Sequence, residues 1–180
     1  MPNPILDPTG ATTATATARP QARRAPRRKD LHGATIGLLV NTKQNAAPFL
    51  DEIGRLLIDQ HGASKAIART KVNFAQPAPE ELIKELQASC DVIVTGIGDC
   101  GSCSASAVAD GIALEAAGLP AAAICSDAFG VTADAMAELR GAPGYPYATT
   151  PHPVAVLTPE QVRERAAQVL GDVIALLTDA

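Results

Sequence analysis

The chain has 180 residues, long enough for a domain with a substantial core, and 47% of them are hydrophobic whereas only 3% are aromatic. Such a core is built from small aliphatic side chains and suits helices packed on a parallel sheet. No apolar run approaches the roughly 18 residues that a membrane-spanning helix needs, so we expect no membrane contact.

Basic groups are concentrated at the start of the chain. Residues 1–30 contain six of the 15 Lys and Arg residues but two of the 19 Asp and Glu residues, so residues 31–180 are acidic. An acidic body argues against a nucleic-acid partner. The first 30 residues are rich in Pro, Ala, Thr and Arg, with little to bury. We expect a disordered arm, or an arm that wraps around a neighbouring subunit of a homo-oligomer.

Four cysteines are too few for the disulfide scaffold of a secreted protein of this length, and the first residues lack the pattern of a signal peptide. We therefore expect a cytoplasmic protein. In a reducing cytoplasm, a Cys-x-x-Cys pair such as Cys100 and Cys103 is more often catalytic or metal-binding than structural. Cys90 and Cys125 adjoin predicted strands, and we interpret both mainly as small core residues.

Strand and helix patterns alternate from Leu31 to the end of the chain. The predicted strands cover residues 35–40, 65–72, 91–97 and 119–125, with a short extended piece at 148–150. The predicted helices run from 48 to 61, from 79 onward, from 104 to 117, from 126 to 139 and from 159 onward.

This alternation predicts a single α/β domain at residues 31–180. We expect a three-layer, open parallel sheet of four to five strands, Rossmann- or flavodoxin-like, with helices on both faces. Right-handed crossovers bring the loops that follow the strands to one edge, where such sheets bind ligands.

One of these loops carries the residues with the clearest chemistry. The segment Asp99-Cys100-Gly101-Ser102-Cys103 lies between a buried strand and an alanine-rich helix. Free N–H groups and the positive end of the helix dipole favour a reactive thiolate at Cys100. Cys103 follows in the first helical turn, so its sulfur can face that of Cys100. It could then close a disulfide or accept a group attached to Cys100.

The residues around the two sulfurs are candidates for holding a substrate. Gly98 and Gly101 would let a small molecule approach the backbone, whose N–H groups could hold a developing oxyanion. Ser102 and Ser104 are further candidates for substrate contact at the same turn. Asp99 could act as an acid/base or orient the turn, or it could simply cap the helix.

Three residues distant in the sequence should reach the same edge. His152, between two prolines, could keep Cys100 ionised or bind the substrate, although a loop histidine is often inert. Asn41 and Lys43 follow the first strand, and Lys43 could bind a substrate carboxylate or remain a solvated lysine. Asp110 and Glu115 lie farther along the helix, and we interpret them mainly as structural, with Asp110 the better candidate for a role in the site.

The motif Gly98-Asp99-Cys100-Gly101-Ser102-Cys103 resembles a family named for a Sec-Gly-Ser-Cys motif, the UGSC type. Some of its members carry selenocysteine where this chain has Cys100. The resemblance extends over nearly the whole chain except residues 11–30. It includes Asp7-Pro8-Thr9-Gly10, residues 37–43, Asp110 with residues 113–115, Gly118-Leu119-Pro120 and Pro151-His152-Pro153.

More distantly, the chain looks like the selenoprotein B component of the glycine, sarcosine and betaine reductases, and the proline reductase subunit is similar. That component uses its selenol to attack a carbon next to a carboxylate and to expel an amine. The resemblance implies that Cys100 is a nucleophile and Cys103 its partner. Cysteine in place of selenocysteine is a weaker nucleophile and a worse leaving group.

The first hypothesis for function is an enzyme in which Cys100 attacks a small carboxylate-bearing molecule. A carbon–heteroatom bond would be cleaved or exchanged through a covalent S-adduct. Lys43 and backbone N–H groups would hold the substrate, His152 or Asp99 would move protons, and Cys103 would release the product. A thiol reductant or a partner redox protein could complete the cycle. This chemistry calls for no cofactor and no metal.

Two alternatives remain open. A thiol–disulfide oxidoreductase would also place Cys-x-x-Cys between a strand and a helix, but this pair follows a third strand and we expect no cis-proline opposite it. The second alternative is a non-catalytic module that binds a metal or a partner. Its zinc ligands would come from Cys100, Cys103, Cys125 and His152.

Overall fold

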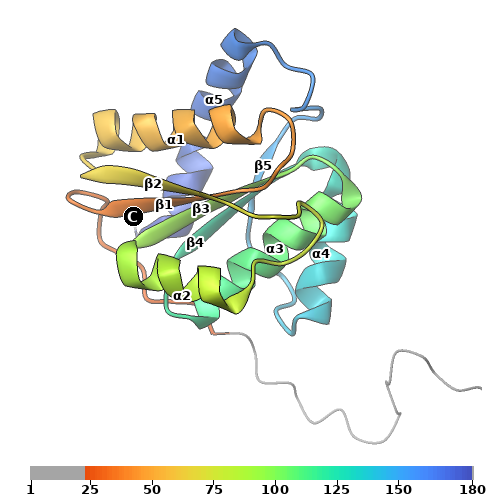
Figure 1. Cartoon of the computed structure of the whole chain (residues 1–180), viewed down its shortest axis with the longest axis horizontal. Coiled ribbons are helices and arrows are strands. Elements are labelled where there is room, and N and C mark those ends of the chain that lie inside the picture. Colours follow the sequence, from red (N-terminus) through yellow and green to blue (C-terminus); the bar gives the residue numbers. More distant parts are fainter. Residues whose placement is uncertain (1–22, 180) are drawn as a thin grey trace, which may run out of the picture.

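The computed structural model describes residues 23–179 and shows a five-stranded parallel sheet between two layers of helices (Figure 1). The strands are β1 (Thr35–Val40), β2 (Lys65–Thr70), β3 (Val92–Gly98), β4 (Ala121–Ser126) and β5 (Ala148–Thr150). They lie in the order β2-β1-β3-β4-β5 and all pair in parallel. This is the flavodoxin-like order, and it confirms the predicted fold class.

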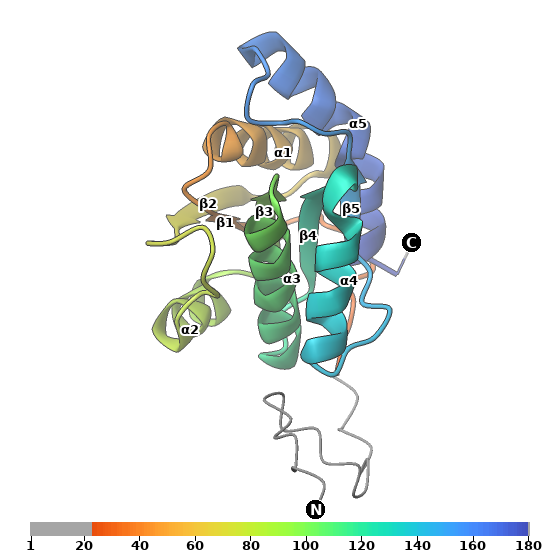
Figure 2. The same cartoon turned by 90° about the vertical axis from the view of Figure 1, so that its right-hand side faces the viewer.

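The helices are α1 (Ala46–His61), α2 (Glu80–Ser89), α3 (Gly101–Ala116), α4 (Gly130–Leu139) and α5 (Pro159–Leu177), with a 3-10 turn η1 at Asp127–Phe129. α1 and α5 cover one face of the sheet, and α2, α3 and α4 cover the other (Figures 1 and 2). In the described residues 23–179, no helix has both the length and the apolar character to cross a membrane.

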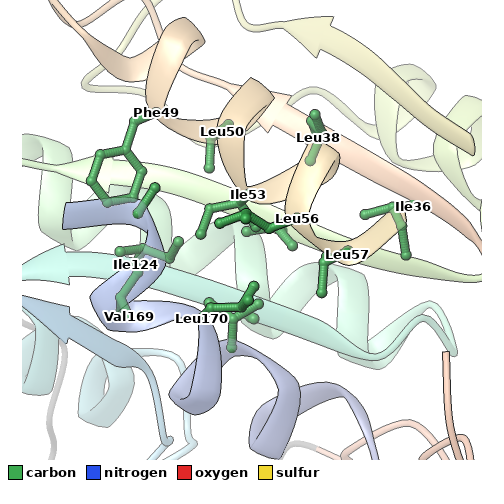
Figure 3. Packing of buried hydrophobic residues seen from close by; sticks show 14 of the residues in the cluster. Ile36, Leu38, Phe49, Leu50, Ile53, Leu56, Leu57, Ile124, Val169 and Leu170 are labelled. Atoms are coloured by element: carbon green, nitrogen blue, oxygen red, sulfur yellow. The ribbon is translucent and has the colours of Figure 1, made fainter. Parts of the chain in front are cut away.

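The face under α1 and α5 holds the larger aliphatic side chains of the core. Phe49, Ile53 and Leu57 recur at helical spacing along α1 and are fully buried against the sheet. They pack with Val169 and Leu170 of α5 over the strands (Figure 3). Two amphipathic helices thus seal this face, which leaves the chemistry to the edge of the sheet and to the other face.

Small residues let α3 approach the sheet closely on the other face. Every residue of β3 is buried, and α3 is buried along most of its length. A Cβ at Gly111 would lie 2.6 Å from the Tyr145 hydroxyl oxygen, so glycine makes room there for a buried ring. The low aromatic content therefore reflects a core of closely approaching helices and strands.

Two predicted boundaries differ from those observed. α3 begins at Gly101, three residues before the expected start, because Cys100 caps the helix and the residues after it already hydrogen-bond as helix. β2 ends at Thr70, two residues early, because Lys71 turns into the interior instead of continuing the strand.

The packed part of the chain also begins before Leu31, where we had expected it to start. Ala25 is buried, and its N–H donates to Glu115 at 2.6 Å. Arg27 forms a two-pronged ion pair with the same carboxylate. The backbone of Arg28 forms an isolated parallel β-bridge with that of Thr178, near the end of the chain. The predicted start at Leu31 is therefore several residues late, and residues 1–22 of the expected arm lie outside the described residues.

Candidate functional site

The two cysteines of the turn are joined by a disulfide, with their Cα atoms 5.1 Å apart. Cys100 is the N-cap of α3 in an extended conformation, and its sulfur accepts the Cys103 N–H at 3.3 Å. Cys103 is fully buried, whereas Cys100 is only half-buried. The expectation that the two sulfurs face each other is confirmed, and the pair is asymmetric towards solvent.

Two residues flank Cys100 on its open side. The Ser102 side chain is exposed, and its Oγ lies 3.6 Å from the Cys100 sulfur. A Cβ at Gly101 would meet only Thr132 Cγ2, at an ordinary 3.6 Å. Ser102 and Gly101, two of the predicted substrate-contact residues, therefore lie beside the Cys100 sulfur with open space around them.

Two other predicted contact residues serve the packing of the protein itself. A Cβ at Gly98 would lie 2.7 Å from Ser104 Cα and 2.8 Å from the Cys125 sulfur. The Ser104 side chain is buried, and its hydroxyl donates to the Gly98 carbonyl at 2.9 Å. The approach that we expected for a substrate at Gly98 is thus occupied by α3 and β4, so that expectation is wrong. The glycine is needed because helix and strand meet there.

Asp99 is buried, and it connects the cysteine turn to the loop after β5. Its carboxylate accepts the N–H groups of Val154, at 3.0 and 3.1 Å to its two oxygens, and of Ala155 at 2.9 Å. It also lies 2.9 Å from Nδ1 of His152. The helix cap is instead Cys100, so the alternative of Asp99 as a simple cap is wrong.

His152 is held in one orientation by three neighbours. A carboxylate has no proton to donate, so Nδ1 must carry the hydrogen that Asp99 accepts, and in the neutral ring Nε2 is then the acceptor. Ser126 Oγ lies 3.3 Å from the same nitrogen and donates to the Gly98 carbonyl at 3.1 Å. The Phe129 ring packs edge-on at 5.2 Å. The His152 side chain remains 37% exposed, so a small molecule can reach it.

The peptide bond between His152 and Pro153 is cis. The expectation that no cis-proline accompanies the cysteine turn is therefore wrong. The His152 N–H donates to Asp127 Oδ1 at 3.0 Å, which fixes this loop against η1. The loop after β5 thus meets the turns that follow β3 and β4.

The loop after β1 is tied to the end of β3. Asn41 is buried; its Nδ2 donates to the Ile97 carbonyl at 2.8 Å and its Oδ1 accepts the Lys43 N–H at 3.1 Å. The Asn41 amide is therefore engaged within the protein. The Lys43 ammonium lies 5.8 Å from the centre of the Phe74 ring, over its face. Of the two predicted residues, Lys43 presents the charge at this edge.

A buried ion pair lies farther along α3, where we had considered a site role for Asp110. Lys71 Nζ is 2.5 Å from Asp110 Oδ2 and 2.7 Å from Ser106 Oγ. Asp110 also accepts the Ala78 N–H at 2.6 Å. Burial raises the pKa of Asp110, against the lowering effect of the Lys71 charge. This ion pair holds the loop between β2 and α2 against α3. Sequence reasoning did not single out Lys71 as the partner of Asp110.

The structure does not favour the zinc alternative. Two of its four suggested ligands, Cys100 and Cys103, are bonded to each other. Between residues 23 and 179, no three His, Cys, Asp or Glu side chains are grouped so as to hold a metal ion. Cys125 is fully buried, and burial raises the pKa of its thiol to about 12, so it remains a neutral core residue.

Sequence reasoning gave no role in the site to Ser126 and missed Phe129, and both residues help to position His152. Ser126 ends β4 and Phe129 lies in η1 directly after it, at the same edge of the sheet as the cysteine turn, and that placement was the available signal. The site therefore combines a sulfur pair, a buried carboxylate that orients an imidazole, and a lysine across the edge. This set can supply a nucleophile, a proton carrier and a counter-charge for an anion.

Comparison with known families gives a match over almost the whole chain. The UGSC family model matches residues 4–179, a span that contains the cysteine turn and His152. No curated protein matches the chain.

Proposed function

The chain belongs to the UGSC family, and we propose that it is a thiol-dependent enzyme that attacks a small carboxylate-bearing molecule through Cys100. The observation that carries this proposal is the asymmetric sulfur pair at the start of α3. The half-buried Cys100 is the sulfur that a substrate can reach, and the fully buried Cys103 is bonded to it from within.

The helix start favours Cys100 as the attacking group. Its sulfur accepts the Cys103 N–H, and it sits at the N-terminus of a 16-residue helix, where the dipole stabilises negative charge. In the reduced protein the same N–H would face a thiolate. Ser102 Oγ, 3.6 Å from this sulfur, supplies a further polar neighbour.

The proposed reaction has two steps. In the first, the Cys100 thiolate displaces a leaving group X from a carbon of substrate R–X, so that a thioether forms and X departs with the bonding electron pair. In the second, the Cys103 thiolate attacks the Cys100 sulfur, the S–C bond breaks, and R leaves with its electron pair and takes up a proton. The products are RH, HX and the Cys100–Cys103 disulfide.

The disulfide must then be reduced before another cycle. The two thiols have supplied the two electrons that convert R–X to RH, so an external thiol reductant or a redox protein must restore them. A reducing cytoplasm contains such reductants, and we propose that compartment for the protein.

We assign the proton transfer to His152. Asp99 holds Nδ1, so Nε2 can take or give the proton that the departing groups exchange. Asp99 is thus a positioning residue, anchored by two backbone N–H groups. Lys43, on the loop fixed by Asn41, supplies the positive charge for the substrate carboxylate.

Alkylation of the reduced protein tests this proposal. Iodoacetate carries a carboxylate and iodoacetamide does not, and each rate is divided by its rate with a free thiol. We expect Cys100 to favour iodoacetate by about tenfold, the value of one favourable charge contact. Lys43→Gln should remove that preference, whereas Lys65→Gln, an exposed lysine at the opposite edge, should retain it.

Intact mass spectrometry with candidate substrates then separates the two steps. Cys103→Ser should accumulate the S-adduct, because no thiol can resolve it, and Cys100→Ser should form none. If Cys100→Ser formed the adduct or kept its turnover, the proposal would be lost.

The disulfide itself supports a second candidate, a thiol–disulfide oxidoreductase. Such an enzyme needs no carbon substrate and would exchange its disulfide with that of a partner protein. Equilibration with glutathione tests this second candidate. A reduction potential below about −300 mV, as in structural disulfides, would exclude an exchange catalyst.

A further inference from the structure

A groove between α3 and α4 opens beside the reactive turn. The two helices lie side by side over the same face of the sheet (Figure 2). The groove has a volume of about 290 Å³. Its walls are almost entirely apolar and are formed by Gly101, Ser102 and Ala105 of α3 and by Thr132, Ala135, Met136 and Leu139 of α4.

This groove begins at the two residues that follow Cys100 in the chain. Ser102, whose Oγ lies 3.6 Å from the Cys100 sulfur, forms part of its wall. Gly101, the residue after the nucleophile, forms the adjacent part and keeps the entrance wide. A group attached to the Cys100 sulfur would therefore lie next to an apolar groove whose wall begins at the following residue, Gly101.

The volume of the groove favours a small molecule over a partner helix as its occupant. A helix roughly 10 Å across fills about 400 Å³ in each turn, which exceeds the whole groove. Pockets for small molecules begin at about 300 Å³ and are lined mainly by apolar groups. A short alkyl or aryl group fits both the volume and the lining, whereas a partner helix does not.

We propose that the groove between α3 and α4 is the subsite for an apolar group of the substrate. The molecule that Cys100 attacks is then a carboxylate that also carries a short alkyl or aryl substituent. Its charge lies towards Lys43 and its apolar group between α3 and α4. This inference rests on the proposed function, because it assumes that Cys100 forms the covalent bond.

Uncharged alkylating reagents test the groove without the carboxylate. The reduced protein is treated with iodoacetamide or with N-butyliodoacetamide, and each rate at Cys100 is divided by the rate with N-acetylcysteine. We expect the normalised rate to be about tenfold higher for the butyl reagent, since each buried methylene contributes severalfold. A ratio near one would overturn the inference.

Two variants locate the effect. Ala105→Leu and Ala135→Leu fill the groove from opposite walls, and either should bring the ratio of the two reagents to within about twofold of one. Ala88→Leu adds the same side chain at an exposed position of α2 and should keep the wild-type ratio. Because the readout is a ratio, a general change in Cys100 reactivity cancels.

A butyl preference that survives both filling variants would overturn the inference. Failure of the proposed function has a different signature, the absence of an iodoacetate preference and of an adduct in Cys103→Ser. The two failures are therefore separable in one set of labelling experiments.

Discussion

Two buried carboxylates lie at opposite ends of the parallel strands, and each accepts hydrogen bonds from backbone N–H groups. Asp99 follows β3 at the edge with the cysteines, and its carboxylate accepts the N–H groups of Val154 and Ala155. Glu115, near the other end of α3, accepts the N–H groups of Ala25 and Ala121. Each carboxylate thus joins a distant segment of chain to the sheet.

They differ in the third partner. Glu115 pairs with Arg27 through two contacts, at 2.7 and 2.9 Å, and the Arg27 side chain is only 9% exposed. Asp99 contacts His152, which is 37% exposed. A guanidinium keeps its charge at every physiological pH, whereas an imidazole gains and loses a proton. The same kind of anchor therefore holds a permanently charged side chain at one edge and, at the other, the imidazole to which we assign proton transfer.

The largest expected effect is at the carboxylate with the permanently charged partner. Glu115→Gln removes the charge opposite a nearly buried Arg27, and breaking such a pair costs about 3–5 kcal/mol of unfolding free energy. Urea unfolding measures this loss. Glu164→Gln, at an exposed position of α5, should change the same free energy by less than about 0.5 kcal/mol. The folded Glu115→Gln protein should still alkylate at Cys100, and loss of that reaction would contradict the division of roles.

A smaller loss of stability, coupled to a loss of activity, is expected at the other carboxylate. Asp99→Asn replaces one acceptor oxygen with an N–H₂ group that faces backbone N–H donors, which costs about 1–3 kcal/mol. It also releases His152, so conversion of the S-adduct to the disulfide should slow about 100-fold. Intact mass spectrometry follows that conversion over time.

His152→Gln is the matched variant for this effect. It removes the proton carrier but leaves the Asp99 contacts with the backbone, so the same rate should fall while the unfolding free energy changes by less than about 1 kcal/mol. Equal losses of stability in the two variants would show that His152 is part of the structural anchor. The comparison between the two edges would then fail.

The fold and the reactive turn could be predicted because their signals are local. The β-branched run from Val92, the glycines and the alanine-rich stretch after Cys103 each specify their own conformation over a few residues. Alternation of such segments leaves few topologies once right-handed crossovers are required. The facing of Cys100 and Cys103 follows from helical spacing in the same way.

The partners of the buried charges could not be predicted, because they come from distant parts of the chain. Arg27 lies among basic and proline residues whose composition is typical of a disordered arm, and nothing local indicates that Glu115 binds it. Lys71 follows a strand, where lysines are usually solvated, yet it is buried against Asp110. Gly98 was interpreted as an opening for substrate, although its missing side chain makes room for Ser104.

Cys125, a further buried ionisable group, contacts a neutral carbonyl instead of a charged partner and gives the smallest effect. Its thiol faces the neutral carbonyl of Ser104 at 3.9 Å, and burial raises its pKa from 9.0 to about 12. The folded protein therefore holds this proton more tightly than the unfolded chain. Its contribution to stability is complete below pH 9 and is lost as the pH rises towards 12, by about 1.4 kcal/mol per pH unit.

Urea unfolding of reduced protein at pH 8, 9 and 10 should show a steeper loss for the wild type than for Cys125→Ala. Tyr145 and Tyr147, whose pKa values burial also raises, are present in both proteins and cancel. Parallel pH profiles would mean that Cys125 ionises as readily in the folded chain as in the unfolded one. A thiolate buried at this edge would then be tolerated without a charged partner.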